Sequence, residues 1–280
     1  MKLLFILFTF ITLLNARVIT FSPLSMDKSP KLFLSYKPLL KYLEKETGYK
    51  FKYYFSPTYK DLLIDFQHKK IDIVELGPLP FLKLYSQYKH AKPFLTFKSK
   101  NYRPYYTCNM VTTDKSINTL NDVVSNKVQI ELTRKLSTCG YLMSEYILNT
   151  QNKTLKDFNY KYNGTHSSVL LQTLFNHNSV GIAKSTIIDK YKPFKFKIIK
   201  KSPDIPGFAF VANTNTLTTE EIRNIQNAII KLNPEYNKKH RKLMKEWSSN
   251  TKYGAIKTKK DAYSLILKTM DEIKIPKGIK

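Results

Sequence analysis

Short runs of β-branched and aromatic residues alternate along this chain with longer stretches in which apolar residues recur every three or four positions. In the stretch 30–47, for example, Leu39, Leu40 and Leu43 fall on one helical face, and Gly48 follows as a C-cap. The pattern predicts strands over 18–21, 51–55, 71–76, 106–113, 128–132, 179–183, 194–200 and 208–213. It predicts helices over 30–47, 59–68, 81–88, 119–124, 141–148, 164–175, 222–232, 238–247 and 260–273.

Strands that alternate with helices favour an α/β fold with mixed, mostly parallel sheets flanked by helices. The elements form two series, and the second (105–207) is nested between the parts of the first (17–104 and 208–280). We therefore expect two lobes joined by two crossovers. In open α/β sheets ligands bind beyond the carboxyl ends of the strands, so the expected binding place is the cleft between the lobes.

The amino terminus has the pattern of a secretory signal. Lys2 precedes an apolar run from Leu3 to Leu14, and Asn15-Ala16 offers a cleavage point before Arg17. The run is too short to span a bilayer, so we expect residues 1–16 to be a cleaved signal peptide and the protein to be exported to the periplasm. The alternative is an uncleaved membrane anchor.

The formal net charge of +26 raises the question of nucleic-acid binding. Only five of the 47 basic residues are arginine, and the lysines are spread along the chain in short clusters. Recognition of phosphate backbones and bases favours the bidentate arginine fork, so we expect no nucleic-acid partner. The charge can still attract small anions or an acidic membrane surface.

The segment Ser137-Thr138-Cys139-Gly140-Tyr141 lies between the predicted strand 128–132 and the predicted helix 141–148. Hydroxyl and thiol side chains therefore stand at a helix start, where unpaired N–H groups and the helix dipole favour an anion. The segment predicts a site for a tetrahedral oxyanion. The simpler alternative is that Ser137 and Thr138 only cap the helix.

The two cysteines, Cys108 and Cys139, leave two structures open: a disulfide, or two small and partly buried side chains. Cys139 at a helix start could also act as a nucleophile with His166 as its base, which would make the protein an enzyme. No third, orienting residue is evident. The histidines show no paired metal-ligand spacing, and we expect neither a metal nor a cofactor.

Several segments together resemble one family, the periplasmic substrate-binding proteins of ABC transporters for phosphonate, phosphite and phosphate. The similar segments, in chain order, are 36–44, 47–48, Tyr59, 71–73, 77–78, 137–141, 164–166 and 202–206. Within them, 137–141 is similar to the family's Ser-Thr-Ser-Gly-Tyr element, and 164–166 to its Gly-Ser-His element. The resemblance implies the two-lobed, type II periplasmic-binding-protein fold.

The resemblance also implies a ligand site. Its members would be Tyr59, Gly77, Pro78, Tyr106, Ser137, Thr138, Cys139 and His166. Tyr59, Tyr106 and His166 would donate hydrogen bonds to the oxyanion, with Tyr105 as an alternative to Tyr106. The turn at 77–78 would let the ligand approach the backbone closely.

Three positions depart from the family pattern. Cys139 replaces a serine, which exchanges a hydroxyl donor for a weak thiol donor. Gly181 and Phe208 stand where many members carry an acid that accepts a hydrogen bond from the ligand. We therefore expect aminophosphonates to bind no better than simple oxyanions.

The sequence thus predicts an exported, monomeric protein without enzymatic activity. It would bind a small oxyanion, phosphonate-, phosphite- or phosphate-like, and present it to the membrane permease of an ABC transporter. Two alternatives remain: a ligand-sensing periplasmic module that signals to a membrane partner, and a Cys139-dependent enzyme.

Overall fold

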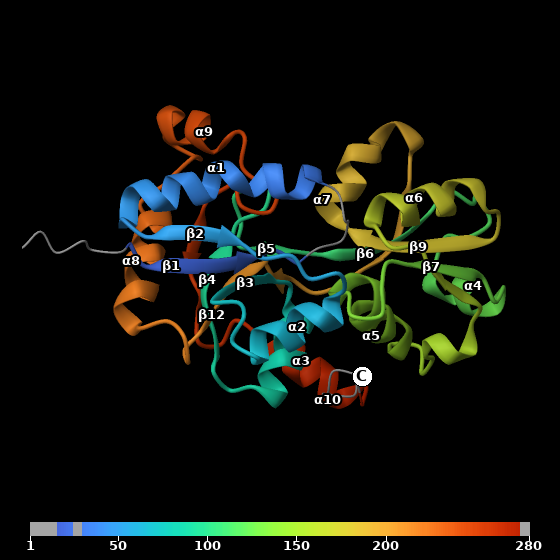
Figure 1. Ribbon diagram of the computed structural model, residues 1–280. Coiled ribbons are helices and arrows are strands. Elements are labelled where there is room, and N and C mark those ends of the chain that lie inside the picture. The colour runs from blue at the N-terminus through green and yellow to red at the C-terminus, as the bar shows by residue number, and fades with distance from the viewer. Residues whose placement is uncertain (1–15, 25–29, 275–280) are drawn as a thin grey trace, which may run out of the picture.

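The computed structural model describes residues 16–24 and 30–274. They form two lobes, each a β-sheet with helices on both faces (Figure 1). The chain crosses between the lobes at β5 (Tyr105–Tyr106) and again at β11 (Ile205–Pro206), and these two strands pair antiparallel. The expected two-lobed α/β fold with two crossovers is confirmed. The predicted signal peptide lies outside the described residues, except for its last residue, Ala16.

The first lobe has a six-stranded sheet in the order β13-β4-β12-β3-β1-β2. Its strands are β1 (Val18–Ser22), β2 (Lys50–Tyr53), β3 (Ile73–Leu76), β4 (Ala91–Phe97), β12 (Ala209–Asn213) and β13 (Ala255–Lys257). Its helices are α1 (Pro30–Thr47), α2 (Tyr59–Gln67), α3 (Pro78–Gln87), α8 (Thr219–Ile230), α9 (Lys238–Met244) and α10 (Ser264–Glu272). β1 pairs parallel with β2 and β3, while β12, β4 and β13 add antiparallel pairs.

The second lobe has a five-stranded sheet in the order β10-β6-β9-β7-β8. Its strands are β6 (Cys108–Thr112), β7 (Gln129–Leu132), β8 (Tyr160–Tyr162), β9 (Ser179–Lys184) and β10 (Lys197–Lys201). Its helical segments are α4 (Leu120–Ser125), η1 (Thr138–Leu142), α5 (Met143–Asn149), η2 (Leu155–Asp157), α6 (His166–Phe175), α7 (Ser185–Ile188) and η3 (Asp189–Phe194). Both sheets are mixed. The sequence predicted mostly parallel strand pairs, but antiparallel pairs make up a larger part of the sheets than expected.

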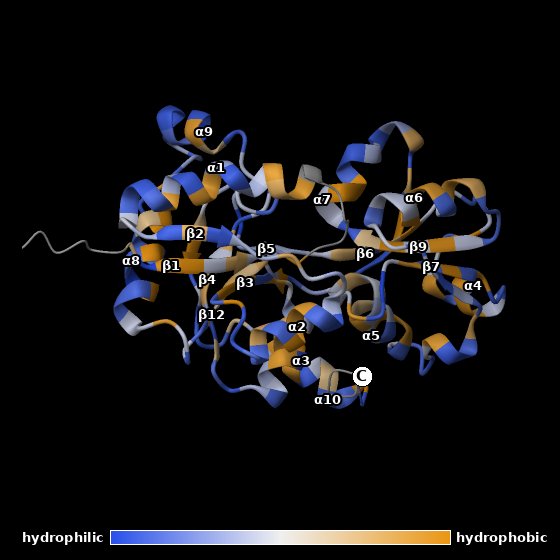
Figure 2. Cartoon of the chain, viewed as in Figure 1, coloured by the Kyte–Doolittle hydropathy of each residue, from blue (hydrophilic) through white to orange (hydrophobic). Residues whose placement is uncertain are grey.

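Neighbouring residues of the central strands of the first lobe pack on opposite faces of the sheet, because side chains alternate along a strand. Ile73 and Phe210 pack with α1 and α8, whereas Val74 and Val211 pack with α2, α3 and α10. In Figure 2 the apolar residues gather on the strands and on the inward faces of the helices. None of the helices in the described part of the chain is long and apolar enough to cross a membrane.

Apart from the two-residue crossover strands β5 and β11, three strands, β4, β8 and β13, were not expected from the sequence. Pro93 interrupts the apolar pattern of β4, and it lies where the register between β4 and β12 shifts, which accommodates its missing N–H donor. β8 and β13 each have only three residues and lie at sheet edges. Such short edge strands have little hydrophobic pattern to reveal them.

Candidate functional site

A cavity of about 610 Å³ lies between the two lobes. Parallel strands from both sheets end at it: Leu24 follows β1, Gly77 follows β3, and Lys184 is the last residue of β9. The loop after β7 brings Ser137 to the same cavity. This is the expected position, since open α/β sheets bind ligands beyond the carboxyl ends of their strands.

The structure brings seven of the eight residues expected at the site into the wall of this cavity. They are Tyr59, Gly77, Tyr106, Ser137, Thr138, Cys139 and His166. The eighth, Pro78, is the buried first residue of α3, and Pro80 lines the cavity in its place. Of the two candidate tyrosines at the crossover, Tyr106 rather than Tyr105 lines the cavity.

The segment 137–142, which we call the anion turn, forms one π-helical turn that continues directly into α5. Ser137 is its N-cap, and its Oγ accepts a hydrogen bond from the backbone N–H of Gly140 at 3.0 Å. Ser137 therefore does cap the helix, and its hydroxyl still keeps its proton for a ligand. The first N–H groups of such a turn have no partner inside the helix and can bind an anion.

Gly140 is required by close packing. A Cβ at this position would lie 2.0 Å from Oγ1 and 2.6 Å from the backbone nitrogen of Thr133, the residue after β7. The anion turn is thus pressed against the end of its own strand. Any side chain at position 140 would displace the turn from this strand end.

Thr138 joins the two lobes. Its Oγ1 accepts a hydrogen bond from the backbone N–H of Leu79, in the first turn of α3, at 3.1 Å. Nearby, the guanidinium of Arg134 in the second lobe lies 5.5 Å from the ring centroid of Tyr59 in the first. The lobes therefore touch each other across the cleft beside the anion turn.

Cys139 forms a disulfide with Cys108, the first residue of β6, and their Cα atoms are 5.2 Å apart. The thiol-donor role expected for Cys139 is therefore wrong, because a disulfide sulfur has no proton to donate. The Cys139-dependent enzyme is excluded for the same reason: no thiolate is available as a nucleophile. The disulfide instead ties the anion turn to the strand that leaves the crossover.

His166, the first residue of α6, is held in one tautomer. Its Nδ1 accepts a hydrogen bond from the backbone N–H of Lys184 at 3.3 Å. Burial and the nearby Lys184 charge lower the pKa of His166 to about 3, so the ring is neutral at pH 7. With Nδ1 as the acceptor, Nε2 carries the proton and is a hydrogen-bond donor at the cavity.

The two tyrosines of the site are also neutral donors. Burial raises the pKa of Tyr59 despite the opposing charge of Arg134. Burial likewise raises the pKa of Tyr106. Both phenols therefore keep their protons at pH 7, as a donor to an oxyanion must.

Sequence reasoning missed Lys184. Its Nζ lies 4.4 Å from the ring centroid of Tyr106 and 5.2 Å from that of Phe208. Burial lowers the pKa of Lys184 to about 8, while Glu75 acts in the opposite direction. Its position at the carboxyl end of a strand was the available signal.

Of the two positions where the family often has an acid, only 208 belongs to the site. Phe208 lines the cavity. Gly181 instead packs against α6, where a Cβ would lie 2.3 Å from Oγ1 of Thr173. The identity of residue 181 is therefore not informative about the ligand. The part of the expectation against aminophosphonates that rests on Gly181 is wrong.

Behind the cavity wall lies Glu75, a buried carboxylate that accepts a hydrogen bond from the hydroxyl of Tyr36. Burial raises the pKa of Glu75 to about 7, and hydrogen bonds from Tyr36 and Asn250 and the Lys184 charge oppose the rise. Tyr36 and Asn250 line the cavity, but Glu75 does not.

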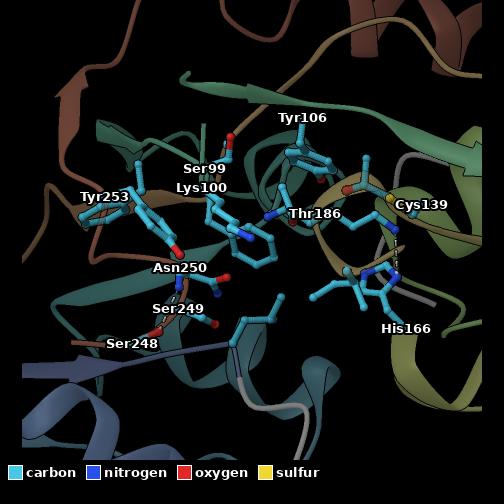
Figure 3. A pocket seen from close by; sticks show the side chains of 18 of the residues that line it. Ser99, Lys100, Tyr106, Cys139, His166, Thr186, Ser248, Ser249, Asn250 and Tyr253 are labelled. Atoms are coloured by element: carbon cyan, nitrogen blue, oxygen red, sulfur yellow. Dashed lines mark hydrogen bonds between the residues drawn. The ribbon is translucent and has the colours of Figure 1, made fainter. Parts of the chain in front are cut away.

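Figure 3 shows the cavity from close by. Cys139 and His166 lie on one side, and Lys100, Tyr253, Ser248 and Asn250 lie on the other. We call the first side, formed by the anion turn and His166, the turn wall. The side formed by Lys98, Lys100 and Lys252 is the lysine wall.

Two sheets joined by two crossovers around one cleft, with helix-start donors at the strand ends, define a two-lobed ligand-binding protein of the periplasmic type II fold. Residues 21–263 match the family described as "ABC transporter, phosphonate, periplasmic substrate-binding protein". The chain belongs to this family of non-catalytic binding proteins.

The chain is 26% identical over 212 residues to the phosphonates-binding periplasmic protein of Escherichia coli. The match covers 72% of this chain and 63% of that relative's length.

Solved structures are similar in fold. The binding protein component of an ABC phosphonate transporter from Pseudomonas aeruginosa has a TM-score of 0.75 and 22% identity, over 93% of this chain and 87% of that one. PhnD1 from Prochlorococcus marinus, in complex with methylphosphonate, has a TM-score of 0.73 and 16% identity, over 93% and 99% of the two chains.

Proposed function

We propose that this protein is exported to the periplasm and binds a phosphonate or a similar oxyanion between its lobes. The lobes comprise residues 17–104 with 208–280, and residues 105–207. The bound form would be presented to the permease of an ABC transporter, with no chemical change to the ligand. Residues 1–16 would be the signal peptide, and the working form would be a monomer.

The observation that carries this proposal is the set of neutral donors around the anion turn. The hydroxyls of Ser137 and Thr138 and the first N–H groups of the turn come from the second lobe. Tyr59 adds a phenol from the first lobe and Tyr106 another from the crossover, while His166 adds Nε2. A tetrahedral oxyanion has several acceptor oxygens, and donors that converge from both lobes match it.

Binding at this place would also favour lobe closure. Donors of the two lobes would share one anion, and the Thr138–Leu79 hydrogen bond already joins the lobes beside it. A ligand that contacts both lobes stabilises the closed arrangement by its additional contacts there. Two proteins of the same family or fold, from E. coli and P. marinus, are described as binding phosphonates, which supports the choice of ligand class.

The test is calorimetric titration of methylphosphonate, phosphite and phosphate into the purified protein and into the double variant Ser137→Ala with Thr138→Val. We expect the wild type to bind at least one of these anions and the variant to lose binding while it stays folded. The loss of two hydrogen bonds to a charged ligand corresponds to about 100-fold or more in affinity.

A matched control makes the same chemical changes in the second lobe, away from the cavity, with Ser125→Ala and Thr150→Val. Both residues are exposed. The control should bind like the wild type. Unchanged affinity in the Ser137 and Thr138 variant would refute the site.

A further inference from the structure

The charge lining of the cavity is one-sided. Among the described residues that line it (16–24 and 30–274) there are five lysines and no aspartate or glutamate. The lysines are Lys98, Lys100, Lys184, Lys190 and Lys252. They come from both lobes, so their mutual repulsion opposes closure unless an anion lies between them.

The cavity is also large for the anion that the donors of the turn wall can hold. Its volume of about 610 Å³ lies in the range of roughly 300–1,000 Å³ of sites for drug-sized molecules. A methylphosphonate at the turn wall leaves most of this space, and the lysine wall, without a ligand group. The ligand that fits the whole cavity extends from the turn wall toward the lysines.

Lys184 is placed to meet that extension. Its ammonium lies over the faces of two aromatic rings, those of Tyr106 and Phe208, and cation–π contacts hold it there. In the described part of the chain no carboxylate forms an ion pair with it. Its charge is therefore available to a ligand.

Glu75 is the charged group of opposite sign that acts on Lys184, so it is the competing explanation. Glu75 lies outside the cavity wall and is engaged by Tyr36. Its attraction does not offset the burial of Lys184, because the pKa of that lysine remains lowered, to about 8. A partly buried ammonium without a close counterion is costly, and an anionic ligand group would remove the cost.

We propose that the phosphonate ligand carries a second anionic group, a carboxylate or a further phosphonate, and that Lys184 binds it with help from Lys100 of the lysine wall. Aminophosphonates, whose second group is a cation, are then disfavoured ligands. The inference rests on the proposed function, because the first anionic group would be held at the anion turn.

The test compares ligands that share one arm and differ at its end. Ethylphosphonate, 2-aminoethylphosphonate, 2-carboxyethylphosphonate and ethylene-1,2-bisphosphonate are titrated by calorimetry at low and moderate salt. We expect the carboxyethyl or the bisphosphonate ligand to bind about 10- to 100-fold more tightly than ethylphosphonate, and the amine more weakly. Comparison of the two anionic ligands distinguishes a carboxylate from a second phosphonate.

Three variants test which residue causes the preference for a second anionic group. In Lys184→Met the ligands with and without this group should bind almost equally tightly. In Lys100→Met the difference between them should be reduced in part. In both variants ethylphosphonate should lose less affinity than the ligands with two anionic groups. Lys45→Met removes the same charge from an exposed position on α1 outside the cavity and should leave the preference unchanged. Circular dichroism checks that Lys184→Met is folded.

The outcomes separate the two proposals. Binding of none of the phosphonates would overturn the proposed function. Binding of ethylphosphonate without any gain from a second anionic group would overturn this inference alone. A gain that persists in Lys184→Met, or an equal loss for all ligands in that variant, would overturn the assignment to Lys184.

Discussion

The turn wall and the lysine wall of the cavity are assembled in different ways. The turn wall is mainly one continuous segment, the anion turn, whose cap, first turn and glycine follow each other directly in the chain. The lysine wall is made of two segments that are far apart in sequence. Lys98 donates its backbone N–H to the carbonyl of Gly254 at 2.8 Å, and the pairing of β4 with β13 continues this contact.

This difference shows which part of ligand recognition can be predicted from the local sequence. Donors for a common headgroup come from a motif that builds its own geometry, through capping and close packing against its strand. The groups that select the rest of the ligand come from loops joined only by the fold. The two walls can therefore change independently, and the following experiments test that independence.

The largest expected effect on ligand affinity concerns Gly140→Ala. The added Cβ collides with Thr133, so the anion turn must shift, at a cost of about 1–3 kcal/mol in the free energy of unfolding. Misplaced donors should lower the affinity for methylphosphonate by about 100-fold or more. Urea unfolding and calorimetry measure the two effects.

Gly77→Ala is the matched control on the opposite side of the turn. A Cβ there meets Phe208 at 3.5 Å and Thr138 at 3.7 Å, which are ordinary contacts. The variant should be as stable as the wild type. If Gly140→Ala were equally well tolerated, close packing would not explain that glycine.

The second experiment removes the disulfide, with Cys108→Ser and Cys139→Ser together. The bond joins residues 31 apart in sequence, and its loss should reduce the free energy of unfolding by about 3 kcal/mol. Because the bond ties the anion turn to β6, headgroup affinity should fall. The preference for 2-carboxyethylphosphonate over ethylphosphonate should stay the same, and a lost preference would show that the two walls are coupled.

The smallest expected effect is a pH dependence of that preference. Lys184, with its pKa lowered to about 8, is charged below this pH and loses its charge as the pH rises through it. The preference for the second anionic group should therefore decline by about tenfold above pH 8. Glu75, Lys190, His166 and Tyr106 surround the ammonium; His166 and Tyr106 stay neutral near pH 8.

The preference is measured as the ratio of the affinities for 2-carboxyethylphosphonate and ethylphosphonate. Both ligands carry a phosphonate group, so its ionisation cancels in this ratio. Lys184→Met provides the control and should show a flat ratio from about pH 8 to about pH 10, above the pKa of about 7 of Glu75. A wild-type ratio that is equally flat would contradict a role for the lysine charge.

Much of the fold was predictable because its signals are local. The 30–47 helix, the alternation of strands with helices and the nested second lobe all follow from hydrophobic spacing and caps. The strands β4 and β13 were missed because Pro93 breaks one pattern and the other has only three residues. These two strands carry the lysine wall, so that wall could not be anticipated.

Within the site, the sequence shows which segments can bind an anion, since an anion turn needs only a strand, a hydroxyl cap, a glycine and a helix in succession. The tertiary structure alone pairs Cys108 with Cys139, turns Gly181 toward α6, and sets Lys184 over Tyr106 and Phe208. The physical reason is that contacts between distant residues depend on sheet register and on the crossovers, and no local pattern of residues encodes these.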